Sequence, residues 1–262
     1  AVKEVLVKRH PRESFLLATK LPAWAGPKTA EEAKAMFYTS LERTGAGYFD
    51  FYLLHNLGDN RTQVFDEFGI WEFLAERKKE GLIKNLGFSF HDKADVLDRV
   101  LTAHPDMDFV QLQINYADWE SDSVQSRLCY ETARRHGKPV IIMEPLRGGR
   151  LVQGLPESAK RVFEKTTPKR SPAEWGLRWV WNHPEVTVIL SGMNEIEQVE
   201  ENVRIASEAK ADSLTKEELE VFEQVKQEIN KKIKVPCTGC AYCMPCPQGV
   251  NIPGCFSAYN MR

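Results

Sequence analysis

The amino-acid sequence predicts an α/β protein in which parallel strands alternate with helices, and two observations support this fold class. Short apolar segments rich in branched and aromatic residues recur at intervals of roughly 30 residues, with helical periodicity between them. Successive helices end in a charged pair followed by a glycine, as in 78–81 and 134–137. Units in this order indicate parallel strands joined by right-handed crossovers. Six such units are expected, and they fit either a doubly wound sheet or a β/α barrel.

The first half of the chain is expected to contain three strands. Its expected elements are, in order, the end of a helix at 2–9, a strand at 14–20, a helix at 28–44, a strand at 49–56, a helix at 64–79 and a strand at 83–91. Thr29 and Glu32 have the spacing of a capping box for the second of these helices. The first two strands end in polar residues: the first at Lys20, and the second at His55 and Asn56.

The second half repeats the alternation and then changes in composition. Its expected elements are a helix at 93–102, a strand at 108–116, a helix at 124–135, a strand at 139–145, a helix opened by Ser171 and Pro172, a strand at 186–192, and helices at 195–209 and 215–232. Beyond about Ile233, proline, glycine and cysteine dominate and the periodicity is lost. We therefore expect a β/α part at 1–212, a helical linker at 213–234 and a cysteine-rich segment at 235–262.

The charge balance argues against several classes of partner. The 262 residues include 35 lysines and arginines against 37 aspartates and glutamates, so the formal net charge is −2. A chain so close to neutral has no general attraction for nucleic acid or for an anionic membrane. No apolar run reaches the length of a membrane span, and the start of the chain lacks the order of a signal peptide. We expect a cytoplasmic protein with neither nucleic-acid nor membrane partners.

Lys20 and His55 are candidate catalytic residues because each ends a strand. In β/α folds the carboxyl ends of the parallel strands carry the chemistry. The two residues close consecutive strands, in the segments Leu-Ala-Thr-Lys and Leu-Leu-His-Asn. A histidine at a strand end, taken alone, is more often a structural residue. The lysine one strand earlier favours the functional interpretation.

Five of the six cysteines lie near the end of the chain, which indicates a metal rather than disulfides in a cytoplasmic protein. Cys237, Cys240, Cys243 and Cys246 are separated by two residues each, and a proline follows the last. A zinc ion usually takes two separate Cys-x-x-Cys pairs, whereas a continuous run can surround a cluster. The run resembles that of bacterial ferredoxins, whose last gap is three residues instead of two. A [4Fe–4S] cluster is expected, with Cys255 as the alternative to Cys246.

The lysine and histidine at the strand ends resemble those of the aldo-keto reductase superfamily, whose members are (β/α)8 TIM barrels that move hydride between NAD(P)H and a carbonyl. The resemblance covers about residues 1–210 and makes the six units strands 3 to 8. It implies that Lys20 and His55 belong to a tetrad of aspartate, tyrosine, lysine and histidine. The tyrosine protonates the carbonyl oxygen of a small substrate, the lysine lowers the pKa of the tyrosine, and the histidine orients the substrate. The cysteine segment matches a sub-group with ferredoxin-type clusters.

The same resemblance implies a set of cofactor contacts. Two polar residues on neighbouring strands would hold the nicotinamide carboxamide, and a methionine would pack on the ring. The loop at 144–149 would cover the pyrophosphate, and the start of the last helix of the β/α part would hold the adenosine end. The implied residues are Ser89, Gln111, Met143, Leu146, Arg147, Gly148, Ser191, Gly192, Gln198, Glu201 and Asn202.

The chain also departs from the family pattern. Phe90 replaces the asparagine that usually follows Ser89, and Gln198 replaces the arginine that usually faces the 2′-phosphate of NADPH. Both NADP and NAD therefore stay open as cofactors. No tyrosine or aspartate precedes Lys20, so the chain lacks the expected catalytic tyrosine and aspartate. Because uncovered sheet edges are a liability, we expect a fragment of a longer protein in which strands 1 and 2 precede these residues.

Two alternatives remain. In the first, the barrel is a scaffold and the cluster is the active element of an electron-transfer or partner-docking module. Phe90, Gln198 and Met143, which stands where many family members have a tyrosine, favour it because each weakens a cofactor contact. In the second, the cysteine segment binds zinc. A redox partner protein is expected where the segment holds an iron–sulfur cluster. His91 is a further candidate for the mouth of the site, whereas Cys129 is expected to be an ordinary buried thiol.

Overall fold

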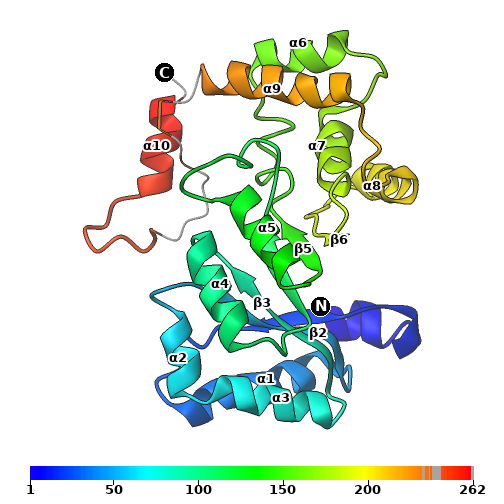
Figure 1. Ribbon diagram of the computed structural model, residues 1–262. Coiled ribbons are helices and arrows are strands. Elements are labelled where there is room, and N and C mark those ends of the chain that lie inside the picture. Colours follow the sequence, from blue (N-terminus) through cyan, green and yellow to red (C-terminus); the bar gives the residue numbers. More distant parts are fainter. Residues whose placement is uncertain (232–233, 236, 238–242, 261–262) are drawn as a thin grey trace. The chain divides into compact units, whose positions relative to one another are not determined.

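The computed structural model describes residues 1–231, 234–235, 237 and 243–260. Within these residues the chain forms a sheet of six parallel strands in the order β1-β2-β3-β4-β5-β6 (Figure 1). The strands are β1 (Ala18–Leu21), β2 (Phe49–Leu57), β3 (Ile83–Phe90), β4 (Phe109–Gln113), β5 (Val140–Met143) and β6 (Val186–Ile189). Each strand pairs with the next one along the chain, without the reversal of order that defines a doubly wound sheet. The winding is therefore that of a β/α barrel.

Helices provide the crossovers that parallel neighbours require. They are α1 (Ala30–Thr44), α2 (Thr62–Glu67), α3 (Ile70–Lys79), α4 (Ala94–Ala103), α5 (Ser126–Arg135), α6 (Glu157–Lys165), α7 (Pro172–Trp181), α8 (Ile196–Glu208), α9 (Lys216–Asn230) and α10 (Ile252–Asn260). Two short helical turns, η1 (Lys3–Val7) and η2 (Arg12–Ser14), precede β1. In the described part of the chain, no helix combines the length and the hydrophobicity needed to cross a membrane.

Side-chain caps lie at the starts of three described helices, and at α7 the Ser171 hydroxyl group accepts the backbone N–H of Glu174. The hydroxyl group of Thr215 accepts the backbone N–H of Glu218, and the Glu218 carboxylate accepts the backbone N–H of Thr215, which completes the capping box of α9. Thr29 likewise accepts the backbone N–H of Glu32 at the start of α1. The Glu32 carboxylate, however, accepts the N–H of Lys28 at 2.7 Å. The prediction of a capping box at α1 is therefore only half confirmed.

Several boundaries differ from the sequence-based expectation. The single helix expected at 64–79 is two helices, because Gly69 takes a left-handed φ of 59° between α2 and α3. The strand expected at 14–20 is confined to β1, and η2 occupies its start. Two helices, α6 and α10, were not predicted. Pro253 lies in the first turn of α10, where a missing N–H breaks no helical hydrogen bond.

The chain divides into two compact units. The first, here called the sheet unit, comprises Ala1–Ile114, Asp118–Met143 and Glu185–Leu190 and contains all the strands of the sheet. The second, here called the helical unit, comprises Asn115–Ala117, Glu144–Pro184 and Ser191–Arg262. Each unit is described below by itself.

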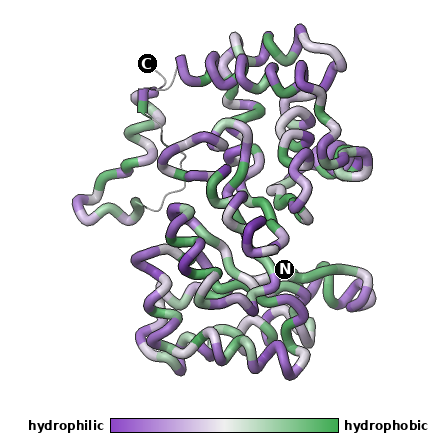
Figure 2. Tube along the Cα trace, viewed as in Figure 1, coloured by the Kyte–Doolittle hydropathy of each residue, from purple (hydrophilic) through white to green (hydrophobic). Residues whose placement is uncertain are grey.

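The sheet unit has a core on each face of its sheet. On one face Leu53, Phe109 and Ile141, from three different strands, form a buried cluster. On the other face the ring of Phe37 from α1 meets that of Tyr52 at a centroid distance of 5.0 Å. Figure 2 shows mainly hydrophobic residues along the strands and alternating character along the helices. This pattern is expected of a sheet covered by amphipathic helices.

Aromatic residues form the core of the helical unit. Phe163 of α6 stacks on Trp175 of α7 with 5.7 Å between ring centroids, and Phe222 of α9 contacts both rings. The ring of Tyr116 lies 5.2 Å from that of Phe222. Burial of large aromatic side chains is among the strongest contributions to packing, so this cluster explains how α6, α7 and α9 are held together.

Candidate functional site

Lys20 and His55 lie near the carboxyl ends of neighbouring strands, on the same face of the sheet. Lys20 pairs with Leu53 in the register of β1 and β2. His55 is two residues further along β2, and alternate residues of a strand project to the same side. Leu53 also pairs with Gly87 of β3, so Ser89 follows on this face by the same alternation. The structure thus brings the two candidate catalytic residues to one end of the sheet.

The electrostatic environment of this end is positive. Burial lowers the pKa of Lys20 to about 8. Burial also lowers the pKa of His55, and the charges of Lys20 and Arg61 lower it further. The pKa of His91 is lowered to about 3 by burial and then by the charges of Arg61, Lys20 and His55. Both imidazoles are therefore neutral at neutral pH, and Lys20 loses its proton more readily than an ordinary lysine.

Asn56 and Arg61 belong to this end of the sheet and were missed as site residues by the sequence analysis. Asn56 has a left-handed φ of 63°, and its backbone N–H donates to the Ser89 hydroxyl at 2.8 Å. Arg61 donates from Nε to the Asn56 carbonyl at 2.9 Å and lies 3.5 Å from the His91 carbonyl through Nη2. The Asn56 amide is buried and makes no hydrogen bond within the described part of the chain. The asparagine at the end of an apolar strand could have indicated a left-handed backbone here, because asparagine tolerates this conformation better than most residues.

The indole ring of Trp24 packs beside the side chain of His55. Its indole N–H donates to the carbonyl oxygen of His55 at 2.8 Å, and its ring centroid lies 5.8 Å from that of the imidazole. The side chain is 39% exposed, so part of the indole faces solvent. An exposed aromatic face at this position can contact an apolar part of a bound molecule.

The residues expected at the nicotinamide lie on adjacent strands of the same unit. Ser89 of β3 is paired in register with Gln111 of β4, and both side chains are buried. The Gln111 side-chain amide donates to the sulfur of Met143 on β5 at 3.1 Å. The structure therefore brings together these three predicted residues, although the Gln111 amide already has a partner within the protein.

The residues expected at the adenosine end lie in the helical unit, in or just before α8. The Asn202 side chain donates to the Ser191 hydroxyl at 3.1 Å. The Gln198 side chain accepts a hydrogen bond from the backbone N–H of Asn194 at 3.1 Å. The Glu201 carboxylate accepts one from the hydroxyl group of Ser171, the N-cap residue of α7. A β-carbon added at Gly192 would meet no neighbour within 4 Å among the described residues. These contacts order the loop that leads into α8.

The loop after β5 contains the predicted residues Leu146, Arg147 and Gly148. Arg147 and Gly148 both have left-handed backbones, with φ values of 48° and 60°. Leu146 packs on Gly176 of α7 so closely that a β-carbon there would lie 2.6 Å from its side chain. The loop is therefore a tight turn held against α7.

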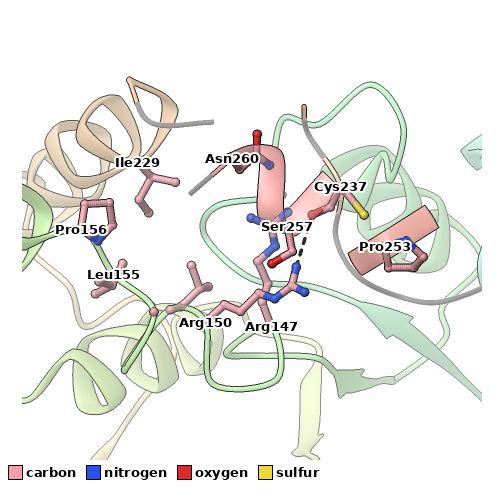
Figure 3. Close-up of a pocket in the computed structure, with 11 residues that line it drawn as sticks. Arg147, Arg150, Leu155, Pro156, Ile229, Cys237, Pro253, Ser257 and Asn260 are labelled. Atoms are coloured by element: carbon pink, nitrogen blue, oxygen red, sulfur yellow. Dashed lines mark hydrogen bonds between the residues drawn. The ribbon is translucent and has the colours of Figure 1, made fainter. Parts of the chain in front are cut away.

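A cavity of about 300 Å³ lies within the helical unit (Figure 3). It is lined by Arg147, Arg150, Leu151, Gly154, Leu155, Pro156, Ile229, Cys237, Pro253, Ser257 and Asn260. Arg150 donates to the carbonyl oxygen of Cys237 at 3.4 Å, and Figure 3 marks this hydrogen bond with a dashed line. A residue expected at the cofactor loop and a residue expected at the metal thus border the same cavity.

Of the expected metal ligands, Cys237, Cys243 and Cys246 are described, and Cys240 lies outside the described residues. The three described cysteines are free thiols. Among the described residues, no three histidine, cysteine, aspartate or glutamate side chains come together as metal ligands would. Asn260 of α10 accepts the backbone N–H of Val235 at 2.8 Å and donates to its carbonyl oxygen at 2.7 Å. These bonds attach α10 to the chain just before Cys237.

A parallel sheet in which each strand pairs with the next has the winding of a β/α barrel, and here a lysine and a histidine lie at the ends of neighbouring strands. The model of the aldo/keto reductase family matches residues 1–226, and the chain belongs to this family.

Curated relatives carry names consistent with this family. The chain is 28% identical over 218 residues to the aldo-keto reductase str7 of Strobilurus tenacellus, covering 72% of this chain and 61% of that protein. It is 24% identical over 253 residues to the uncharacterized oxidoreductase YqkF of Bacillus subtilis, covering 85% of this chain and 78% of that protein. The chain therefore spans about three fifths of the length of the Strobilurus protein.

Solved structures share the fold. The holo form of the aldo-keto reductase AKR11C1 from Bacillus halodurans superposes with a TM-score of 0.64 at 24% identity, covering 83% of this chain and 74% of that one. An aldo/keto reductase from Klebsiella pneumoniae in complex with NADP and acetate superposes with a TM-score of 0.61 at 24% identity, covering 82% and 71%.

Proposed function

We propose that the protein is a nicotinamide-dependent oxidoreductase that transfers hydride between NADP(H) or NAD(H) and a small carbonyl compound or alcohol. The observation that carries the proposal is the pair of Lys20 and His55 on one face of neighbouring strands, close enough that the lysine charge acts on the imidazole. Membership of the aldo/keto reductase family supports it. We further propose that β1 to β6 correspond to strands 3 to 8 of the family barrel.

Each of the two residues has a role that fits its environment. A reduced nicotinamide, when bound, supplies the hydride. His55 has a lowered pKa, and as a neutral imidazole it can donate a hydrogen bond to the carbonyl oxygen of the substrate and orient it. Lys20, whose pKa is lowered to about 8, places a positive charge where negative charge develops on that oxygen.

The residues on β3, β4 and β5 are chemically suited to a nicotinamide. Ser89 offers a hydroxyl group, Gln111 offers an amide, and Met143 offers an apolar thioether at the ends of adjacent strands. We propose NADP as the first cofactor to test, because two of the similar structures are complexes with NADP or NADPH. NAD is tested as well, because Gln198 and Glu201 of α8 carry no positive charge that could bind the 2′-phosphate of NADP.

We also propose that Cys237, Cys240, Cys243 and Cys246 bind a [4Fe–4S] cluster that passes electrons to a redox partner. This part of the proposal rests on the spacing of the four cysteines in the sequence. It makes the cysteine segment an appendage of the reductase, with Cys255 as the alternative to Cys246.

The cofactor proposal is tested by fluorescence titration of the purified full-length protein with NADPH and with NADH. We expect saturable quenching with at least one of them, and weaker binding to a Gln111→Leu variant, which loses the amide but keeps the size of the side chain. A Gln63→Leu change on the exposed face of α2 is the matched control and should leave the affinity unchanged. If neither nucleotide binds at millimolar concentration, the proposal is wrong.

One observation favours a second candidate, in which the barrel is a scaffold and the cluster is the active element. The Gln111 amide donates to Met143, and the Ser89 hydroxyl accepts from Asn56, so both predicted carboxamide contacts already have protein partners. In this alternative, a change at Lys20 leaves the activity of the full-length protein unchanged. The reductase proposal expects the opposite.

A further inference from the structure

His91 lies next to the proposed catalytic pair. It follows Ser89 by two residues, directly after β3, and its backbone N–H donates to the carbonyl oxygen of Leu57 on β2 at 3.2 Å. Gly87, Ser89 and His91 are alternate residues, so the run that faces the same side as His55 continues to His91. Its side chain is only partly exposed.

Arg61 links the end of β2 to the residue that follows β3. Its guanidinium reaches the carbonyl oxygens of Asn56 at the end of β2 and His91 just after β3. Lys20, His55, Arg61 and His91 therefore gather where β1, β2 and β3 end, and we call these four residues the basic cluster. They come from three consecutive units of the sheet, so the fold itself brings them together.

At neutral pH the charged members of the basic cluster are Lys20 and Arg61, and both are positive, whereas the two imidazoles are neutral. Lys20 and Arg61 act on His55, and Arg61, Lys20 and His55 act on His91. The nearest acidic neighbour along the chain is Asp92, whose carboxylate accepts the backbone N–H groups of Asp59 and Lys93 at 2.8 Å each. Asp92 and Arg61 both lie next to Gly58, so the Asp92 carboxylate offsets part of the positive charge of Arg61. Asp92 is not among the groups that shift the pKa of His91.

We propose that His91 and Arg61 bind the anionic end of the substrate, while Lys20 and His55 act on its carbonyl group, so that the substrates are small carbonyl compounds that carry a carboxylate. The substrate class rests on the proposed reductase function, whereas anion binding does not. In the reaction, the carbonyl carbon would gain hydride from a bound reduced nicotinamide, which is oxidised, the carbonyl oxygen would take up a proton that comes from water, and the carboxylate is unchanged.

A carboxylate suits this place better than a neutral group. Partly buried positive charges with like-charged neighbours gain most from an anion, because the attraction is screened less than at an open surface. A neutral imidazole can donate one N–H to a carboxylate oxygen, and a guanidinium can donate several. Trp24 beside His55 offers an apolar surface for a short carbon chain.

The test compares butanoate with butanamide, which has nearly the same shape and no charge. Binding is measured by calorimetry at low ionic strength, with and without NADP⁺. We expect butanoate to bind the wild-type protein at least about tenfold more tightly than butanamide. In His91→Leu this preference should fall severalfold, because leucine cannot donate the N–H that the neutral imidazole offers to the carboxylate. His136→Leu, which removes a histidine paired with Asp98 on α4, is the matched control and should keep the full preference.

A second readout locates the binding. In NMR titrations of the imidazole signals, saturating butanoate should raise the pH at which His91 takes up a proton, by reciprocity with the tighter binding of the anion to the charged form. Equal affinities for butanoate and butanamide, an unchanged preference in His91→Leu, or an unmoved His91 titration would each overturn the proposal. Butanoate binding without binding of NADPH or NADH would refute the reductase function and leave the anion site intact.

Discussion

At the scale of single residues, the site combines positions that the sequence predicted with positions that only the structure reveals. Lys20 and His55 were predictable because a polar residue ends each of two consecutive apolar strands. Arg61 was not, because it lies in a loop without periodicity, and its place depends on the backbone carbonyls of Asn56 and of His91, the second of which is 30 residues away. The sequence shows an asparagine at position 56, but it could not show that the buried side-chain amide makes no hydrogen bond within the described part of the chain.

His91 gives the first prediction, which concerns stability against pH. In the native state its pKa is about 3, whereas a histidine in the unfolded chain titrates at about 6.5. Between these values the unfolded state binds more protons, so the free energy of unfolding falls as the pH falls. The variant His91→Gln lacks this proton uptake and should lose less stability than the wild type between about pH 7 and about pH 5.

Urea denaturation of both proteins at the two pH values measures this difference. Equal losses of stability would mean that His91 is exposed to solvent in the native state and that the site is less buried than described. His136→Gln is the control, since that histidine bonds to Asp98 through Nε2 at 2.8 Å and lies outside the basic cluster.

Gly87 gives the second prediction. A β-carbon at this position would lie 2.3 Å from the backbone oxygen of Phe109 and 2.9 Å from its ring. Gly87→Ala must therefore push β3 and β4 apart, and we expect a loss of about 2 kcal/mol in the free energy of unfolding. Gly192→Ala adds a β-carbon that meets no neighbour within 4 Å and should change stability by less than about 0.5 kcal/mol. Similar midpoints in chemical denaturation for the two variants would contradict the close approach of the strands.

At the scale of elements, periodicity predicted the alternation of strands and helices, and local exceptions set the boundaries. The helix expected at 64–79 is interrupted because Gly69 adopts a conformation that costs other residues energy, and helical periodicity continues across it. The helix α10 was hidden because a proline and a glycine lie near its start, and both residues usually mark loops. Composition alone could not reveal that the proline occupies a permitted position.

The third prediction belongs to α9. Thr215 caps this helix and shares a capping box with Glu218. Thr215→Ala removes an acceptor for a helix N–H and should cost about 1 kcal/mol of stability. Thr215→Ser keeps the hydroxyl group and should retain most of it. If chemical denaturation gives the same loss for both variants, the cap does not stabilise α9.

At the scale of the whole molecule, the winding of the sheet was the most predictable feature. Six units of strand and helix at regular spacing left two topologies open, and the consecutive strand order decides for the barrel type. The residues expected around one cofactor fall into two compact units of the chain, with Ser89 in the sheet unit and Asn202 in the helical unit. Sequence patterns predict elements one at a time, so this division could not be foreseen.

The fourth prediction concerns the metal. Protein purified without oxygen should contain about four iron atoms and a similar amount of sulfide per chain. Cys240→Ala should lose most of the iron, and Cys129→Ala, which changes a buried thiol of α5, should keep it. Comparison of Cys246→Ala with Cys255→Ala identifies the fourth ligand. Zinc without iron on elemental analysis would contradict the cluster.

The central claim is that Lys20 and His55 act on a carbonyl beside a bound nicotinamide, and one measurement tests it most directly. The rate of NADPH oxidation in a single turnover with 4-oxobutanoate or butanal is compared for the full-length wild type and Lys20→Met, a variant of similar length without charge. The account predicts a rate about a hundredfold lower in the variant at saturating NADPH, with NADPH affinity retained. Equal rates in the two proteins, or no oxidation by wild type that has NADPH bound, would contradict it.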